Sequence, residues 1–400
     1  MNRGAYRATP HPIAIALGIV LVAGLVFVGI SVYEPVAGFI MSLGERITPQ
    51  LPEEEEPEDI IVTAPPAEPE PEPEQSKPEP AGEIRAAYMP FSSAGDNASI
   101  KTFLGILPNS VNGVMIDVKD SQGRLLYRSS NENAIAWGAA SEQVVDLAAL
   151  AETLNAEGYH LVARMHTFSD PICARGDRER NAIKYGDSEM LWLDNFQDQG
   201  GKPWSNPYAP TVRGYLTDIA AELAGKGAAM VVLDGMRFPD DNTGTAFFGS
   251  AAARQSRAEI LKEFVSQVEG ALEPLGVRVA VNVPATAVGH VFRDARYGGS
   301  PLELAGEVVL SILPEELAEG YLAEGVIVTR PGTDLGAMVS ETYAYAKSQN
   351  GSVRIIPLLR GQMSGELALT KEQMDAQLSA IGGRDVGEYI LYSQSGAYGS

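Results

Sequence analysis

The chain has 400 residues, 45% of them hydrophobic and 20% charged, which is enough for one large domain with appended segments. Its formal net charge of −22 argues against a nucleic-acid partner, because phosphate recognition requires a basic face. The single cysteine, Cys173, excludes an intrachain disulfide, and we interpret it as a buried structural thiol.

The first predicted element is an uncharged apolar segment, Ile13–Tyr33, preceded by Arg3 and Arg7 and followed by Glu34. At about 1.5 Å per residue, a helix of this length spans roughly 30 Å, the thickness of a bilayer core. The flanking charges predict that residues 1–12 stay in the cytoplasm and that the rest is exported. The length favours an uncleaved signal anchor over a cleaved signal peptide, whose apolar core is shorter. We therefore expect a single-pass protein of the cell membrane with an extracellular C-terminal domain.

Residues 34–82 are predicted to be a linker. Most of it, Pro49–Gly82, consists of Pro-Glu repeats with one lysine, Lys77. Proline stiffening and charge repulsion extend such a chain to about 3.1 Å per residue, and the composition cannot build a core. We predict a disordered Pro/Glu spacer between the membrane and the next domain.

Residues 83–400 are predicted to form one domain in which strands and helices alternate. Eight apolar stretches are typical of buried parallel strands: Ile84–Met89, Gly113–Val118, His160–Phe168, Ala229–Met236, Val277–Val283, Val308–Leu313, Arg354–Leu359 and Glu388–Ser393. Amphipathic segments separate most of them: Ser141–Glu157, Thr211–Gly225, Ser256–Leu272, Asp334–Ser348 and Lys371–Ile381. This pattern predicts an α/β fold, a (β/α)8 TIM barrel. An open doubly wound sheet is the alternative, although no Gly-x-Gly-x-x-Gly turn follows the first strand.

The alternation of side chains along each strand predicts which of them face the barrel interior. Four successive strands place polar side chains on the inner face near their carboxyl ends: Asp117 and Lys119, then Arg164 and His166, then Asp234, then Asn282. Barrel interiors are normally filled with branched apolar side chains, and active sites lie at the carboxyl ends of the strands. The convergence therefore predicts a functional site at that end.

Carboxylates beside arginine, histidine and asparagine suit the hydrolysis of glycosidic bonds, which uses two carboxyl groups. We predict Asp234 as one catalytic carboxylate. Its partner is left open among Asp117, Asp120, Asp170 and Glu315, with Glu315 and Asp117 preferred.

The remaining polar groups near this rim are predicted to bind substrate: Lys119, Asp120, Arg164, His166, Asp170, Arg237 and Asn282. Several of them also fit a purely structural role, since buried charges are normally paired and Arg164 can neutralise Asp117. No metal or cofactor is predicted, because His160 and His166 share a strand face without a third histidine nearby.

The sequence resembles a bacterial family of extracellular TIM barrels that are related to glycoside hydrolases. The resemblance spans residues 84–400 and rests on Val114–Asp120, Leu161–Pro171, Trp204–Pro207 and Leu233–Pro239. It implies a barrel that hydrolyses a polysaccharide or glycan, with a carbohydrate or cell-wall glycan as its partner.

Three positions depart from the family pattern. Gly235 stands where the family has tyrosine, Asn282 where it has aspartate, and Ser311–Pro314 retains only part of the sixth-strand motif. An asparagine cannot act as an acid or nucleophile, but it can hydrogen-bond a sugar hydroxyl. Two functions therefore stay open: a membrane-anchored glycoside hydrolase, and a catalytically inactive barrel that binds glycan or cell-wall polymer. A structural or partner-binding surface protein is a third class, which the inward-facing polar groups disfavour.

Overall fold

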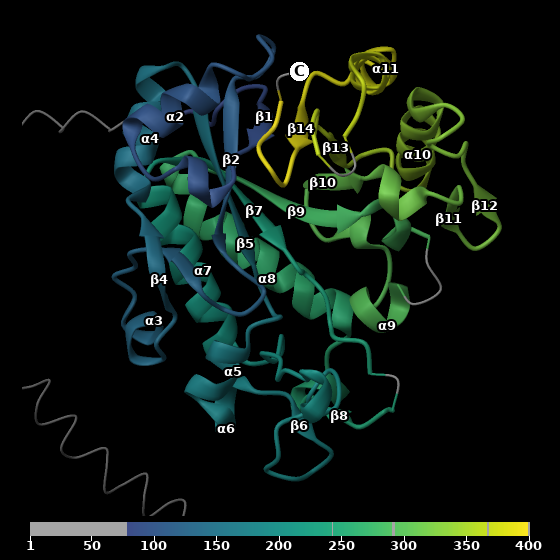
Figure 1. Cartoon of the computed structure of the whole chain (residues 1–400). Coiled ribbons are helices and arrows are strands. Elements are labelled where there is room, and N and C mark those ends of the chain that lie inside the picture. Colours follow the sequence, from purple (N-terminus) through teal and green to yellow (C-terminus); the bar gives the residue numbers. More distant parts are fainter. Residues whose placement is uncertain (1–77, 242, 290–292, 366–367, 399–400) are drawn as a thin grey trace, which may run out of the picture. The chain divides into compact units, whose positions relative to one another are not determined.

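The structure is a computed structural model that describes residues 78–241, 243–289, 293–365 and 368–398 (Figure 1). Eight parallel strands close into a barrel, because the first strand pairs with both the second and the last. In order around the barrel they are β1 (Arg85–Tyr88), β2 (Gly113–Lys119), β5 (His160–His166), β7 (Ala228–Asp234), β9 (Arg278–Pro284), β10 (Glu307–Ile312), β13 (Arg354–Arg360) and β14 (Tyr389–Tyr392). The predicted barrel is confirmed, and closure makes the open-sheet alternative wrong.

The longer helices of the described part of the chain lie between the barrel strands: α2 (Asn97–Leu104), α4 (Leu147–Ala156), α7 (Pro210–Gly225), α8 (Arg257–Leu272), α10 (Leu335–Gln349) and α11 (Lys371–Gly382). Local signals explain where two of them begin. Ser256 before α8 and Thr370 before α11 each form a capping box with the third helical residue, Glu259 and Gln373.

One predicted helix is wrong over about its first third. The segment Ser141–Glu157 forms a strand, β4 (Ala140–Val145), followed by α4. β4 pairs with β3 (Leu125–Tyr127), which itself pairs antiparallel with β2, so the sheet extends beyond the barrel. The helix starts late because Asp146 caps it, accepting a hydrogen bond from the backbone N–H of Ala149 at 3.2 Å.

The core consists of two clusters, which follow the alternation predicted from the sequence. Inside the barrel the packed side chains include Met115, Val162, Val232 and Ala280. Their neighbours along the strands, among them Val114, Ile116, Val231, Leu233, Val279 and Val281, pack outside against the helices. The inner face of each of these four strands is therefore the predicted one.

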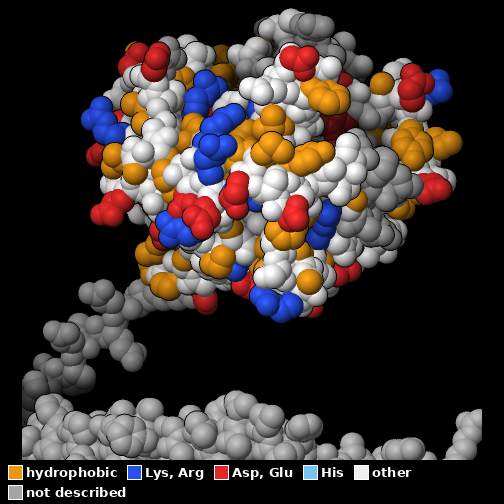
Figure 2. All heavy atoms as spheres, turned by 90° about the horizontal axis from the view of Figure 1, so that it is seen from below, with side chains coloured by type: hydrophobic (Ala, Val, Ile, Leu, Met, Phe, Trp, Pro, Cys, Tyr) orange, Lys and Arg blue, Asp and Glu red, His pale blue; other side chains and the backbone are white. Residues whose placement is uncertain are grey.

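Short segments follow the strands at their carboxyl ends. α5 (Pro171–Gly176), α6 (Arg178–Asn181) and the two-stranded sheet of β6 (Lys184–Tyr185) and β8 (Ala246–Phe247) lie near one another (Figure 1). Further along the chain come α9 (Arg293–Tyr297), the 3-10 turn η7 (Pro314–Leu317) and the hairpin of β11 (Tyr321–Ala323) and β12 (Val326–Ile327), while α3 (Glu132–Ala136) precedes β4. Seen from below the view of Figure 1, the surface mixes acidic, basic and hydrophobic side chains (Figure 2).

The described chain enters the barrel at the amino ends of the strands. Arg278, at the start of β9, donates to the carbonyl oxygen of Gly82 at 2.8 Å and forms a buried ion pair with Glu388 at 2.7 Å. Glu388 also accepts a hydrogen bond from the backbone N–H of Ile84 at 2.8 Å. These contacts attach the segment that precedes β1 to the face opposite the carboxyl ends.

The predicted membrane span Ile13–Tyr33, residues 1–12 and the linker up to residue 77 lie outside the described residues. Within the part that the structure describes, each helix is too short or too polar to cross a membrane.

Candidate active site

Asp234 is the last residue of β7, and its carboxyl group is held on both oxygens. Oδ1 accepts hydrogen bonds from the backbone N–H of Gly235 at 2.8 Å and from the side-chain amide of Asn282 at 2.9 Å. Oδ2 lies 3.3 Å from Nε2 of His166. Ser311, on β10, donates in turn to Oδ1 of Asn282 at 3.0 Å. Four neighbouring strands thus converge on one carboxylate.

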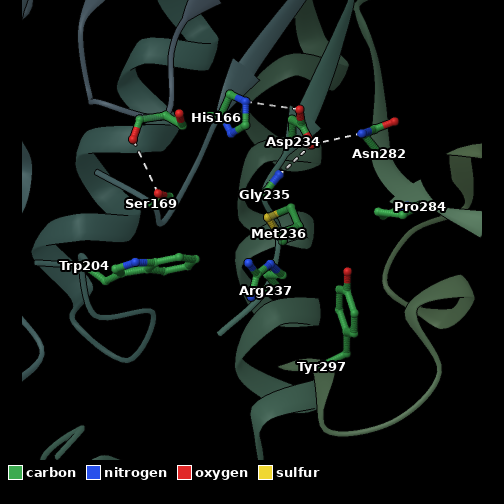
Figure 3. Close-up of a pocket in the computed structure, with 11 residues that line it drawn as sticks. His166, Ser169, Trp204, Asp234, Gly235, Met236, Arg237, Asn282, Pro284 and Tyr297 are labelled. Carbon is green, nitrogen blue, oxygen red and sulfur yellow. Dashed lines mark hydrogen bonds and ion pairs between the residues drawn. The ribbon is translucent and has the colours of Figure 1, made fainter. Parts of the chain in front are cut away.

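A cavity of about 250 Å³ opens onto this carboxylate (Figure 3). In the close-up, His166 and Asn282 flank Asp234 on either side, while Trp204, Arg237 and Tyr297 lie along the far side of the cavity. The complete lining is Ser121, His166, Ser169, Trp204, Asp234, Gly235, Met236, Arg237, Asn282, Pro284 and Tyr297. Its volume is below the usual range of about 300–1,000 Å³ for ligand sites, so a larger ligand would extend beyond it.

The surroundings of Asp234 favour its ionised form. Burial alone would raise the pKa of the carboxyl, but His166, Arg164, the Asn282 amide and the Gly235 N–H together lower this pKa below its ordinary value. The side chain is 17% exposed, so it still reaches the cavity. Asp234 is therefore a carboxylate at neutral pH, suited to act as a base, a nucleophile or a stabiliser of positive charge.

Gly235 is required by the backbone of this site. It has φ of +64°, and a Cβ at this position would lie 3.2 Å from Nδ1 of His166. A side chain here would be strained and would crowd the histidine beside Asp234. The family pattern has tyrosine at this position, and the glycine found here fits the positive φ of the backbone.

Asp117 and Arg164 form an ion pair next to this cavity and do not line it. Nε and Nη2 of Arg164 donate to the two carboxylate oxygens of Asp117 at 2.5 and 2.9 Å, and the Tyr88 hydroxyl donates to Asp117 at 3.1 Å. The guanidinium also lies over the rings of Tyr88 and Tyr392, at 5.4 and 5.5 Å from their centroids. Burial would lower the pKa of Arg164, but Asp117 raises it, so the pair stays charged. The geometry thus shows Arg164 in the structural role considered from the sequence, in which it neutralises Asp117.

Lys119 and Asp170 lie away from the cavity lining, contrary to the inner-face placement of Lys119. The strand pairing shifts register after Asp117, so that Lys119 lies opposite Met165, whose side chain packs in the outer core. Its Nζ forms an ion pair with Asp170 at 2.8 Å, and the two side chains are 0% and 1% exposed. Asp170 also caps α5 by accepting from the backbone N–H of Cys173 at 2.8 Å. Neither side chain has surface left for a ligand.

We expect Asp170→Asn to lower the free energy of unfolding by about 3–5 kcal/mol, because it leaves the buried Lys119 charge without its partner. Lys101→Met is the matched control: it removes an exposed ion pair with Glu157 and should change stability by at most about 1 kcal/mol. Urea unfolding of both variants measures the difference. Equal effects of the two substitutions would contradict the structural role of Asp170.

The other predicted site residues are spread along the rim. Asp120 organises the turn after β2, accepting from the backbone N–H groups of Gln122 and Arg124 at 2.9 Å each. Arg237 lines the cavity and pairs with Asp240 at 3.4 Å. Glu315 forms an ion pair with Arg360 and borders two other cavities. Of the predicted set, Asp234, His166, Asn282 and Arg237 line the same cavity.

Glu316 was not among the predicted site residues. It lies in η7 and borders a neighbouring cavity with Thr286 and Arg296, and Arg296 directly precedes Tyr297 of the Asp234 cavity. Glu316 is exposed at the surface, but desolvation by its neighbours and the charge of Asp234 raise its pKa above the ordinary value. No strand periodicity marks it, because it follows the end of β10.

Tyr297 and Ser311 are also additions from the structure. Tyr297 lines the cavity from α9, and burial, opposed by Arg237 and Arg296, raises the pKa of its hydroxyl to about 12. Ser311 carried a signal that could have found it: Val309 faces the barrel interior, so the residue two positions later shares that face.

A family model described as "Putative glycosyl hydrolase domain" matches residues 86–398. Among curated proteins, none matches the chain significantly.

The chain is also similar to several solved structures. The glycoside hydrolase domain of PgaB (BpsB) from Bordetella bronchiseptica is 15% identical, with a TM-score of 0.53, over 80% of this chain and 95% of that domain. A hypothetical protein from Ruminiclostridium thermocellum is 23% identical, with a TM-score of 0.43, over 49% of this chain and 96% of that one. An α-galactosidase from Thermus thermophilus is 12% identical, with a TM-score of 0.47, over 79% and 59% of the two chains. At 15% identity, the likeness to the Bordetella domain shows a shared fold alone.

Proposed function

Because this chain belongs to the family of glycosyl hydrolase domains whose model spans residues 86–398, we propose that it hydrolyses O-glycosidic bonds of a polysaccharide or glycan at the Asp234 cavity. The observation that carries the proposal is an ionised carboxylate at the carboxyl end of a barrel strand, held by Asn282, Gly235 and His166 and open to a cavity. Active sites of this fold lie at that end of the barrel.

Glycoside hydrolysis needs a second carboxyl group, and Glu316 fits that role better than the predicted Asp117 or Glu315. Asp117 and Glu315 are each paired with an arginine, whereas the pKa of Glu316 is raised by desolvation and by the charge of Asp234. Two carboxyl groups whose pKa values are shifted apart can divide the acid and base roles. In this proposal Glu316 protonates the leaving oxygen. Asp234 acts at the anomeric carbon, directly or through water, and water completes the cleavage.

A catalytically inactive, glycan-binding barrel is the second candidate. The specific observation that favours it is the cavity lining, in which Asp234 is the only carboxylate of the described residues and Asn282 occupies the neighbouring strand end. A carboxylate, an amide, an arginine and an aromatic ring can bind sugar hydroxyls and ring faces without cleaving a bond.

One experiment separates the two candidates. The full chain, solubilised in detergent, is incubated with a panel of cell-wall and other polysaccharides, and both binding and released reducing ends are measured. Release of reducing ends supports the hydrolase. Retention of a polysaccharide without release supports the inactive glycan-binding barrel, and neither binding nor release with any polymer contradicts both.

The membrane anchor and the extracellular location are part of the same proposal. The apolar segment Ile13–Tyr33 and the arginines before it support them. We expect the full chain to stay in the membrane pellet after alkaline carbonate extraction, and a chain lacking residues 1–33 to be released. Protease added to intact cells should digest the barrel domain, and its protection in intact cells would contradict the orientation.

A further inference from the structure

The hydrogen bonds around Asp234 extend one residue beyond the cavity, to a serine to which the proposed reaction assigns no part. Ser311 is buried, and its hydroxyl donates to Oδ1 of Asn282 at 3.0 Å. The Asn282 amide nitrogen then donates to Asp234 at 2.9 Å. The three residues come from β10, β9 and β7, so the relay crosses three adjacent strands.

The orientation of the Asn282 amide decides whether Asp234 faces a hydrogen-bond donor or an acceptor. With its NH2 group toward the carboxylate, Asn282 donates a hydrogen bond. With the amide turned by half a turn, its carbonyl oxygen would face a carboxylate oxygen, and two acceptors would meet. The carboxylate therefore selects the first orientation, and the Ser311 hydroxyl, by donating to the carbonyl oxygen, anchors the other end of the amide in place.

We propose that Ser311 is a positioning residue for Asp234: its hydroxyl fixes the Asn282 amide with the NH2 group toward the carboxylate. This rests on the proposed role of Asp234 in hydrolysis, although the relay itself does not depend on activity. The relay couples proton binding to amide orientation. When Asp234 is protonated it can itself donate a hydrogen bond, and only then does the opposite orientation of Asn282 become favourable.

The relay predicts a specific change in the titration of Asp234. Without the Ser311 hydroxyl the amide is held at one end only, so its hydrogen bond to the ionised carboxylate weakens and protonation becomes easier. The other charged and titratable groups that face Asp234 stay the same in every variant: His166 and Arg164 of β5, Glu316 of η7, Tyr297 of α9 and Arg237 of the loop after β7. A change in titration is therefore attributable to the relay.

The test is the titration of Asp234 in the full chain labelled with 13C at aspartate carboxyl carbons, with Asp234→Asn identifying the resonance. In Ser311→Ala we expect the pKa of Asp234 to rise by about half a unit, the effect of weakening one hydrogen bond. Ser311→Thr keeps the hydroxyl and should restore the wild-type titration. If the enzyme is active, the acidic limb of its pH–rate profile moves with the NMR titration.

Two controls separate positioning from a general effect on the fold. Ser393→Ala removes another buried hydroxyl, at the end of β14, and should leave the Asp234 titration unchanged. In an Asn282→Ala background, Ser311→Ala should cause no further shift, because the link between serine and carboxylate is already gone. Melting temperatures verify folding, and Ser311→Cys replaces Ser311→Ala if the alanine variant does not fold.

An unchanged Asp234 titration in Ser311→Ala overturns the relay, as does an equal shift with and without Asn282. Neither result depends on catalysis, so both are distinct from failure of the hydrolase proposal, which appears as an absence of product from every polysaccharide.

Discussion

Asp234→Asn is expected to lower kcat for the cleaved polysaccharide by roughly 10²–10⁴-fold, the contribution of a positioned general base, with a larger loss if Asp234 is the nucleophile. The substitution keeps the size of the side chain and removes the negative charge. Its effect on KM should be small, because the remaining cavity residues, including Trp204 and Arg237, are unchanged. Initial rates of reducing-end release over a range of substrate concentrations separate kcat from KM.

Asp120→Asn is the matched control for this substitution. This substitution also converts a carboxylate to an amide at the same end of the barrel. The hydrogen bonds of Asp120, however, lie within the turn after β2. Its kcat should remain close to that of the wild type. Equal kcat for Asp234→Asn and the wild type would remove Asp234 from the mechanism, whatever its effect on stability.

Glu316→Gln is expected to have the second large effect on the rate of hydrolysis. The size of this effect should depend on the leaving group. A general acid increases the rate most when the leaving group is a poor one, such as the hydroxyl of another sugar. It increases the rate little when the leaving group is an activated phenol. We expect a loss of roughly 10²–10⁴-fold in kcat/KM for the polysaccharide and a much smaller loss for a nitrophenyl glycoside of the same sugar. Glu315→Gln, which changes the adjacent residue that pairs with Arg360, is the control.

The leaving-group test distinguishes an acid from a residue that merely shapes the rim. A substrate-binding role for Glu316 would reduce the rates for both substrates by similar factors. The same uniform loss in the Glu315→Gln control would point to disruption of η7 and not to acid catalysis.

The pH dependence follows from the opposite shifts of the two carboxyl groups. Hydrolysis needs Asp234 ionised, so the rate falls as pH drops through a pKa that lies below the ordinary aspartate value of about 3.9. It also needs Glu316 protonated, so the rate falls as pH rises through a pKa above the ordinary glutamate value of about 4.3. We expect a bell-shaped kcat/KM profile whose basic limb disappears in Glu316→Gln. A basic limb that survives this substitution belongs to another group.

The fold was predictable from the sequence because each barrel strand is a short apolar run with a clear inner and outer face. Met115, Val162, Val232 and Ala280 lie inside the barrel, as their spacing predicted. The strand β4 was missed because its sequence also fits a helix, and only pairing with β3 reveals the difference. Pairing between distant segments is a tertiary effect that a local pattern does not contain.

The site was predictable only where a strand reaches it. Asp234 and His166 end barrel strands and Asn282 lies two residues before the end of β9, and the alternation of side chains placed all three on the inner face. The alternation misplaced Lys119, because a one-residue register shift moves a side chain to the other face of the strand. Glu316 lies beyond a strand end, where no period applies, and its relation to Asp234 becomes visible only in three dimensions.

The attachment of the chain at Gly82 has a mechanical consequence. Arg278 and Glu388 hold this entry segment at the amino ends of the strands, while the Asp234 cavity opens at the opposite pole. A force applied through the described residues 78–82 would therefore act on the face opposite the cavity. A pull at Gly82 would act first on the contacts of Arg278 and Glu388, which lie at the end of the barrel opposite Asp234.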